Sequence, residues 1–225
     1  MFSGILMGES EIKASEKGNK INQKVYAING SLDLTDYNFN KKGSLIVKGE
    51  WLFLWEKLLN PKNINFNKVK KNGQIIKFPG FWNKLRRKKS NLDQGGQKKY
   101  GPMGFGSFLL KVKGVKNVYK LGLSIKSFSS SYKLYIIQKD SVQKWGGNGT
   151  VGTFPGQTIP QLGPRFNDFI VNDGEFYILI HGSNFHYRGG GLLSGMKMGL
   201  KDEVKTAFDN TKVQKVFTLG IFLFE

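Results

Sequence analysis

Short apolar runs separated by turn residues dominate the chain from about residue 31 to residue 199. Runs that are rich in aromatic and β-branched residues and end at Gly, Pro, Asn or Asp are typical of strands. We find no stretch with a helical period before Gly199, so the pattern predicts an all-β fold, a jelly-roll β-sandwich. The predicted strands cover residues 32–39, 44–55, 74–78, 105–112, 119–125, 131–137, 166–171, 176–180 and 196–199.

The same pattern divides the chain into three parts. Residues 1–24 begin with a short apolar run and continue as a polar, lysine-rich segment, which predicts disorder or a trimmed targeting segment. Residues 25–199 form the predicted jelly-roll domain, with Trp51, Phe53 and Trp55 alternating on one strand face toward the core. Residues 200–225 form a linker that opens with a short helix at Asp202–Phe208, whose first turn is acidic.

The end of the chain allows two interpretations. Val216–Phe224 is uncharged but far shorter than the roughly 20 residues that span a bilayer. Hydropathy therefore favours a last core strand, and the alternative is the beginning of a membrane helix.

A candidate binding site follows the predicted strand Phe176–Ile180. This strand leads into Asn184, His186, Tyr187 and Arg188, which stand directly before three glycines. Arg188 suits a carboxylate or a phosphate, since its guanidinium offers paired donors. The alternative is that Asn184 and Arg188 tie the strand end to neighbouring loops.

Four further residues complete the candidate ligand set. Trp82 and Asn83 follow the turn at Pro79–Gly80, where an aromatic ring can cover the apolar face of a sugar and an amide can bind its hydroxyls. The alternative for Trp82 is packing beneath the loop. Tyr132, at the start of a predicted strand, and Asn148, in a glycine-rich loop, are also assigned to the ligand site.

The chain is strongly basic, with 35 Lys and Arg against 16 Asp and Glu and a net charge of +19. Such a charge attracts polyanions. The lysines are spread along the chain, however, and are concentrated only at Lys84–Lys89 and Lys98–Lys99, within a predicted loop. We interpret them mainly as a solvated surface and do not favour a nucleic-acid partner, although a polyanion-binding protein remains an alternative.

Composition also argues against cofactor and metal chemistry. Cysteine is absent, so the chain offers no disulfide, thiolate ligand or thiol nucleophile. Its two histidines do not suffice for a histidine-rich metal site. The glycine-rich run Gly146–Gly152 lacks the Lys-Ser/Thr ending of a phosphate loop, and no helix is predicted after it. We therefore expect no cofactor and no metal.

Catalytic residues are also lacking. Hydrolysis of a glycosidic bond needs two carboxyl groups that face one cleft, and Asp33, Asp36, Glu50 and Glu56 show no spacing that pairs them. A serine triad would need a histidine beside both an acid and an exposed serine, and no such arrangement is indicated. We expect a binding module rather than an enzyme.

Taken in order, several motifs resemble the extracytoplasmic sensor domain of bacterial seven-transmembrane receptors with diverse intracellular signalling modules. The resemblance covers about residues 31–199. The motifs are Leu32–Thr35, Val47–Phe53, Phe78–Asn83, Gly104–Leu110, Ser131–Ile136 and Ile180–Gly191, followed by Gly199.

This resemblance implies a galactose-binding-like jelly roll on the periplasmic face of the inner membrane that binds a small carbohydrate or carboxylate. In the family, seven membrane helices and a cytoplasmic output module follow, and Lys215–Phe224 resembles the entry into the first of those helices. The chain is then expected to be the sensor part of a longer receptor, with the membrane as a partner through its C-terminal segment. A carbohydrate-binding accessory module or a hydrolase is the alternative.

Overall fold

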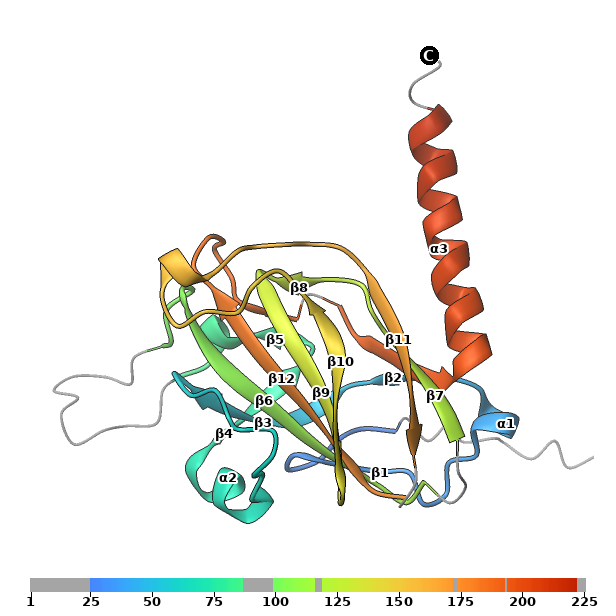
Figure 1. The fold of residues 1–225 in the computed structure, drawn as a ribbon, viewed down its shortest axis with the longest axis horizontal. Coiled ribbons are helices and arrows are strands. Elements are labelled where there is room, and N and C mark those ends of the chain that lie inside the picture. The colour runs from blue at the N-terminus through green and yellow to red at the C-terminus, as the bar shows by residue number, and fades with distance from the viewer. Residues whose placement is uncertain (1–24, 87–98, 116–118, 172–173, 193, 222–225) are drawn as a thin grey trace, which may run out of the picture.

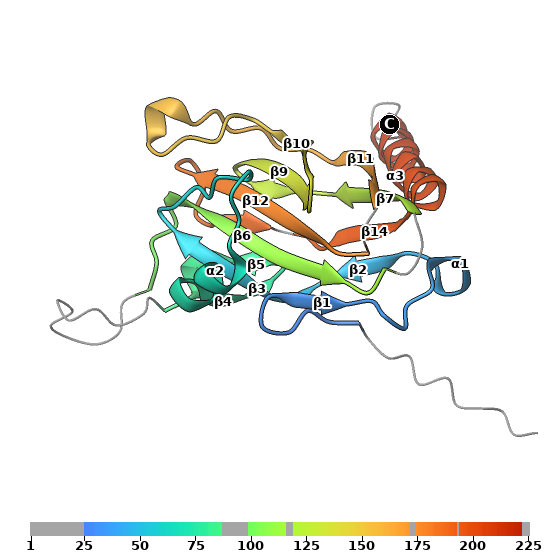
Figure 2. The ribbon, with the colours of Figure 1, turned by 60° about the horizontal axis from the view of Figure 1, so that its bottom comes forward.

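The computed structural model describes residues 25–86, 99–115, 119–171, 174–192 and 194–221. Three sheets build the molecule, which Figures 1 and 2 show from two sides. The large sheet has the order β10 (Ser141–Asn148), β9 (Ser131–Gln138), β12 (Phe176–Asn184), β6 (Gly104–Lys113), β3 (Gly49–Trp55) and β4 (Gln74–Phe78), with β1 (Ser31–Asp33) parallel to β6. The small sheet has the order β11 (Arg165–Val171), β7 (Tyr119–Ile125), β14 (Met196–Leu200) and β2 (Leu45–Val47). The minor sheet has the order β5 (Gly80–Phe81), β13 (Gly191–Leu192) and β8 (Phe128–Ser129).

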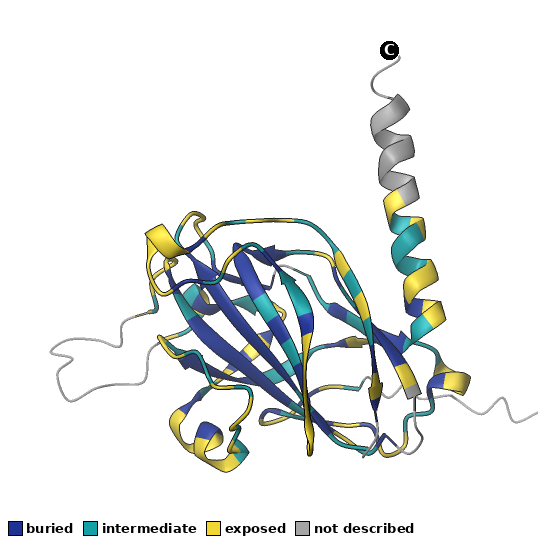
Figure 3. Cartoon of the chain, viewed as in Figure 1, coloured by how far each residue is buried: buried dark blue, intermediate teal, exposed yellow. Residues whose placement is uncertain are grey.

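The main core lies between the large sheet and the two others. Side chains on a strand point alternately to its two faces, and on β12 this directs Phe176, Ile178 and Ile180 into the main core. Figure 3 shows the central strands buried along most of their length. The predicted all-β sandwich is confirmed, and Trp51 and Phe53 are buried in its core as expected.

Short helices interrupt the strands, which the sequence pattern did not predict. Helices α1 (Phe39–Lys42) and α2 (Phe66–Asn72) both precede Gly199, so the expectation of no helix there was wrong. Each is capped by an asparagine side chain, from Asn38 or Asn65, that accepts backbone N–H groups. Helices of one or two turns are too short to show a hydrophobic period. Two 3₁₀ turns, η1 (Trp82–Lys84) and η2 (Pro155–Gln157), complete the elements.

The C-terminal helix α3 (Lys201–Ile221) is far longer than the predicted helix at 202–208. Residues 216–221 are helical, so the favoured prediction of a last core strand was wrong for them; residues 222–225 lie outside the described range. Within the described residues, no helix combines the length and apolar character needed to cross a membrane.

The predicted segment 1–24 and most of the basic loop, residues 87–98, also lie outside the described range.

The outer face of the large sheet carries a second, smaller core beneath residues 57–72. It contains Leu179 of β12 and Val69 of α2 among its buried members. Residues 57–72 cover this core, and two polar side chains of the sheet contact their backbone. Ser107 Oγ donates to Lys57 O at 2.7 Å and accepts from Leu59 N at 3.0 Å, while His181 Nε2 lies 2.8 Å from Leu59 O.

His181 is thereby fixed as a structural residue. Its side chain is 7% exposed, and burial lowers its pKa to about 4, with the nearby Lys133 acting in the same direction. The Leu59 carbonyl acts against this shift but does not cancel it. A neutral imidazole that donates from Nε2 satisfies this geometry.

Candidate ligand-binding site at the loop end of the sandwich

One end of the large sheet carries the loops that were predicted to bind ligand. There β12 ends at Asn184 opposite Gly104 at the start of β6, and Asn148 at the end of β10 stands opposite Tyr132. We call this the loop end; it includes η2, the short gold coil in Figure 1. The loop of residues 185–190, which we call the tip, connects β12 to β13 at this end.

Asn184 is the residue that orders the tip. It is fully buried, and both atoms of its amide are used. Nδ2 donates to Pro102 O at 2.9 Å and to Tyr187 O at 2.8 Å, while Oδ1 accepts from the backbone N–H groups of His186 at 3.4 Å and Tyr187 at 3.1 Å. Asn184 thus ties the strand end to its neighbours, and its own amide is not exposed to a ligand.

The side chains that Asn184 positions are exposed. His186 and Arg188 are exposed and Tyr187 is 40% exposed. Their side chains form no hydrogen bond or ion pair with any other residue that the structure describes, so their donors and the tyrosine ring face solvent. A buried anchor with exposed donors beyond it is a preorganised arrangement for recognition, because the loop loses little conformational freedom on binding.

Trp82 lies in the core and offers no free ring face. It is 0% exposed, and its ring stacks nearly parallel to Phe53 at 6.2 Å. Its Nε1 donates to Gly101 O at 3.2 Å. A Cβ on Gly190 would approach the Trp82 ring to 1.9 Å, so the tip backbone lies directly on the indole. The buried position fits packing beneath the loop and does not fit sugar stacking.

Asn83 and Phe81 connect the minor sheet to the tip. Asn83 Nδ2 donates to Arg188 O at 3.4 Å, and its Oδ1 is buried without a hydrogen-bond partner. Phe81 is half-buried and contacts the tip, because a Cβ on Gly189 would lie 3.0 Å from its ring. Sequence reasoning did not select Phe81, although it precedes Trp82 in the same motif. The structure therefore joins Asn83, Asn184, Tyr187 and Arg188 in one place.

Tyr132 and Asn148 form a separate pair inside the sandwich. Both are buried, and Asn148 Nδ2 donates to Gly163 O at 2.7 Å. The Tyr132 hydroxyl and Asn148 Oδ1 have no partner among the described residues, and burial raises the pKa of Tyr132. Buried polar atoms of this kind are commonly satisfied by internal water. The structure does not bring these two residues to the tip.

The loop end is poor in acidic residues. Among the described residues 56–57, 80–86, 99–104, 129–131, 149–164 and 184–191, Glu56 is the one acid. No group of three or more His, Asp or Glu side chains that could hold a metal occurs in the described part of the chain. The formal charges of the tip and of the adjacent Lys84 are positive, which suits an anionic ligand.

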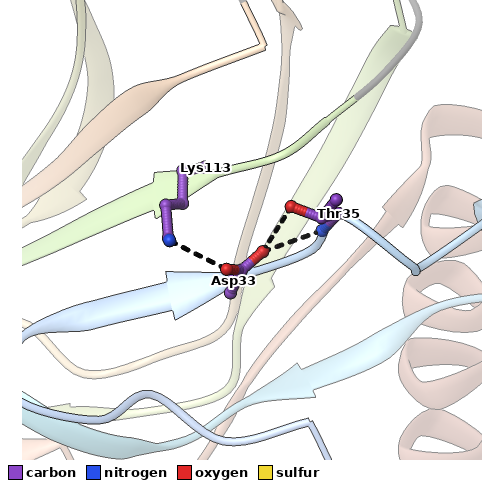
Figure 4. A network of polar contacts seen from close by, with 3 residues as sticks. All are labelled: Asp33, Thr35 and Lys113. Carbon is purple, nitrogen blue, oxygen red and sulfur yellow. Dashed lines mark hydrogen bonds and ion pairs between the residues drawn. The ribbon is translucent and has the colours of Figure 1, made fainter.

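Two of the four acids considered for catalysis, Asp33 and Glu50, have structural contacts away from the loop end. Figure 4 shows Asp33, whose carboxylate lies 2.8 Å from Lys113 Nζ and accepts from Thr35 N at 3.0 Å and Thr35 Oγ1 at 2.6 Å. These contacts, with Lys113 foremost, hold the pKa of Asp33 well below its ordinary value. Glu50 Oε2 accepts from Asn29 N at 2.9 Å. Both carboxylates therefore close turns.

No protein-family model matches the chain, and no curated protein matches it. Among solved structures, the β-glucuronidase of Bacteroides uniformis aligns with a TM-score of 0.47 and 14% identity, over 69% of this chain and 17% of that one. A glycosyl hydrolase family 2 member from Bacteroides cellulosilyticus aligns with a TM-score of 0.45 and 12% identity, over 69% of this chain and 20% of that one. A β-glycosidase from Bacteroides vulgatus aligns with a TM-score of 0.43 and 15% identity, over 69% of this chain and 20% of that one. This chain spans a fifth or less of the length of these proteins.

Proposed function

We propose that this chain is a non-catalytic β-sandwich module that binds a small acidic carbohydrate or another carboxylate at the tip. The observation that carries the proposal is the exposed pair Tyr187 and Arg188 on a loop held by the buried Asn184. A guanidinium binds a carboxylate through paired N–H donors, and a tyrosine ring covers an apolar sugar face. His186 adds a further donor or acceptor beside them.

We further propose that the module is the extracytoplasmic sensor of a membrane receptor. The resemblance of the ordered motifs to that receptor family supports this role. So does the direct connection between the sandwich and α3, which follows β14 without a loop. Glu203 Oε1 accepts from Ser44 N at 2.9 Å and Ser44 Oγ at 2.7 Å, so the beginning of α3 is fixed to the sandwich. A ligand-induced change in the sandwich would then reach the helix.

Titration calorimetry with three matched compounds tests the binding proposal. Glucuronate carries both a sugar ring and a carboxylate, glucose lacks the carboxylate, and acetate lacks the ring. We expect glucuronate to bind more tightly than either. Arg188→Ala should weaken glucuronate binding by about tenfold or more, since a hydrogen bond to a charged group contributes about 1.5–3 kcal/mol.

The matched control is Lys139→Ala, which removes an exposed cation from the β9–β10 turn at the opposite end of the large sheet. It should leave glucuronate binding unchanged. Equal losses for Lys139→Ala and Arg188→Ala would show non-specific attraction to a basic surface and would reject a site at the tip. Tight, steeply salt-dependent binding of duplex DNA without glucuronate binding would instead favour the polyanion-binding alternative.

A further inference from the structure

A hollow lies on the outer face of the small sheet, beneath α3 and apart from the tip. The helix docks over two glycines, Gly122 of β7 and Gly199 of β14, which are register partners. A Cβ on Gly122 would lie 3.1 Å from Val204 Cβ, and one on Gly199 would lie 3.3 Å from Val204 Cγ2. Val204 is therefore fully buried. One turn later Phe208 meets Phe166 of β11 at 5.8 Å between ring centroids.

Beyond this contact the helix and the sheet enclose a hollow of about 360 Å³. Volumes of about 300–1,000 Å³ are typical of small-molecule sites. Apolar groups from both sides line it, with Ile46 of β2 on the sheet and Ala207 and Phe208 on the helix. Ile46 is 44% exposed, so a large apolar side chain here has little cover from the protein.

The polar lining of this hollow is cationic. Lys197 comes from β14, Lys126 from the bend after β7 and Lys212 from the helix, and no acidic residue lines the hollow. These three lysines form no ion pair with a described residue, whereas Lys205 on the same helix pairs with Asp209 at 2.6 Å. Lys212 Nζ lies over the Phe208 ring at 4.6 Å from its centroid. An apolar hollow lined by unpaired cations complements a molecule that is apolar at one end and anionic at the other.

We propose that this hollow binds a single-chain amphiphilic carboxylate of medium length. Its tail would lie against Ile46, Ala207 and Phe208, and its carboxylate would meet Lys197 and its neighbouring lysines. The volume suits one acyl chain of medium length, and the charge selects a carboxylate over a neutral alcohol. Because α3 forms one wall, occupancy would also hold the helix against the small sheet. This site lies beyond the proposed function at the tip and does not depend on it.

Calorimetry on the full chain tests the proposal with octanoate, octan-1-ol and butanoate as probes. We expect one octanoate to bind per chain, with octan-1-ol and butanoate each weaker by about tenfold or more. Lys197→Glu should weaken octanoate by about tenfold or more, because it replaces an attractive charge by a repulsive one. Ala207→Phe should abolish binding by filling the hollow. Far-UV circular dichroism checks that both variants are folded.

The matched control is Lys144→Glu, which reverses an exposed charge on β10, in the large sheet. It should leave octanoate binding unchanged. The proposal is overturned if octan-1-ol binds as tightly as octanoate, if Lys144→Glu weakens binding as much as Lys197→Glu, or if folded Ala207→Phe still binds. A concentration-dependent dimer in light scattering that Ala207→Phe dissociates would also overturn it, because a second copy would then cover the hollow.

Discussion

His181 and His186 belong to one continuous stretch of chain, yet the structure places them in opposite environments. His181 is on β12, 7% exposed, with Nε2 held by the carbonyl of Leu59. His186 is exposed on the tip, and its side chain has no partner among the described residues. Asn184 lies between them, and its buried amide accepts from the backbone N–H groups of His186 and Tyr187.

This contrast separates two tasks that the sequence presents as one cluster of polar residues. Polar side chains on β12 up to Asn184 stabilise the fold, because buried polar groups need hydrogen-bond partners. The side chains beyond Asn184 are free to meet a ligand. Substitutions on the two sides of Asn184 should therefore affect different properties, stability on one side and binding on the other.

The largest effect is expected for Leu179→Ala on the strand side. Leu179 is fully buried in the second core beneath residues 57–72. Its truncation should lower the free energy of unfolding by about 2–5 kcal/mol, through lost burial and a residual cavity. Urea denaturation followed by tryptophan fluorescence measures this change. A loss below about 0.5 kcal/mol, the range of an ordinary surface substitution, would mean that the 57–72 cover is not a true core.

Asn184→Ala should affect both the stability of the fold and the order of the tip. It leaves Pro102 O and the tip backbone without the four contacts that this amide supplies. We expect a loss of about 2–4 kcal/mol in unfolding free energy, since unpaired buried groups cost about 1–3 kcal/mol each. Faster amide exchange at residues 185–188 should accompany it. Unchanged exchange at the tip would contradict the anchoring role of Asn184.

His181 should make stability depend on pH between about 6.5 and about 4. Its folded-state pKa of about 4 is below the ordinary value of 6.5, so the unfolded chain takes up a proton before the folded chain does. The contribution is therefore complete above pH 6.5 and is lost as the pH falls toward 4, by on the order of 2–3 kcal/mol. The difference in unfolding free energy between the wild type and His181→Gln, measured across this range, isolates the histidine from other groups.

The smallest effect on stability is expected at the tip. Arg188→Ala removes an exposed side chain without a partner among the described residues. The free energy of unfolding should change by less than about 0.5 kcal/mol, although glucuronate binding should weaken by about tenfold or more. Thermal denaturation measures the stability change. A marked destabilisation would assign Arg188 to the fold rather than to the site.

The alternation of apolar residues was sufficient to predict the sandwich, because strands with one buried face carry a period of two. This alternation could not predict that Tyr132 and Asn148 are buried, since the face that a strand residue occupies depends on its register. The ladder of β9 and β10 shifts register between Lys144 and Gly146, and the glycines there had been interpreted as a loop rather than as a bulge within a strand. Trp82 was ambiguous for a different reason. Its burial depends on Gly190, which is distant in sequence.

The hollow beneath α3 could not be predicted from the sequence at all. It depends on the pairing of Gly122 with Gly199, which lie on different strands and become a flat floor only when β7 and β14 meet. The tip was predictable in part. Its donors were recognised from their position after an apolar strand, whereas the separate role of Asn184 required its partners to be seen.

The most direct test of the division at Asn184 is a titration of the ¹⁵N-labelled chain with glucuronate, followed by amide chemical shifts. We expect saturable shifts only at residues 185–190 and at Asn83, with no change at His181 or at Lys139. Absence of shifts throughout, or shifts centred on His181 and residues 57–72, would contradict a ligand site at the tip.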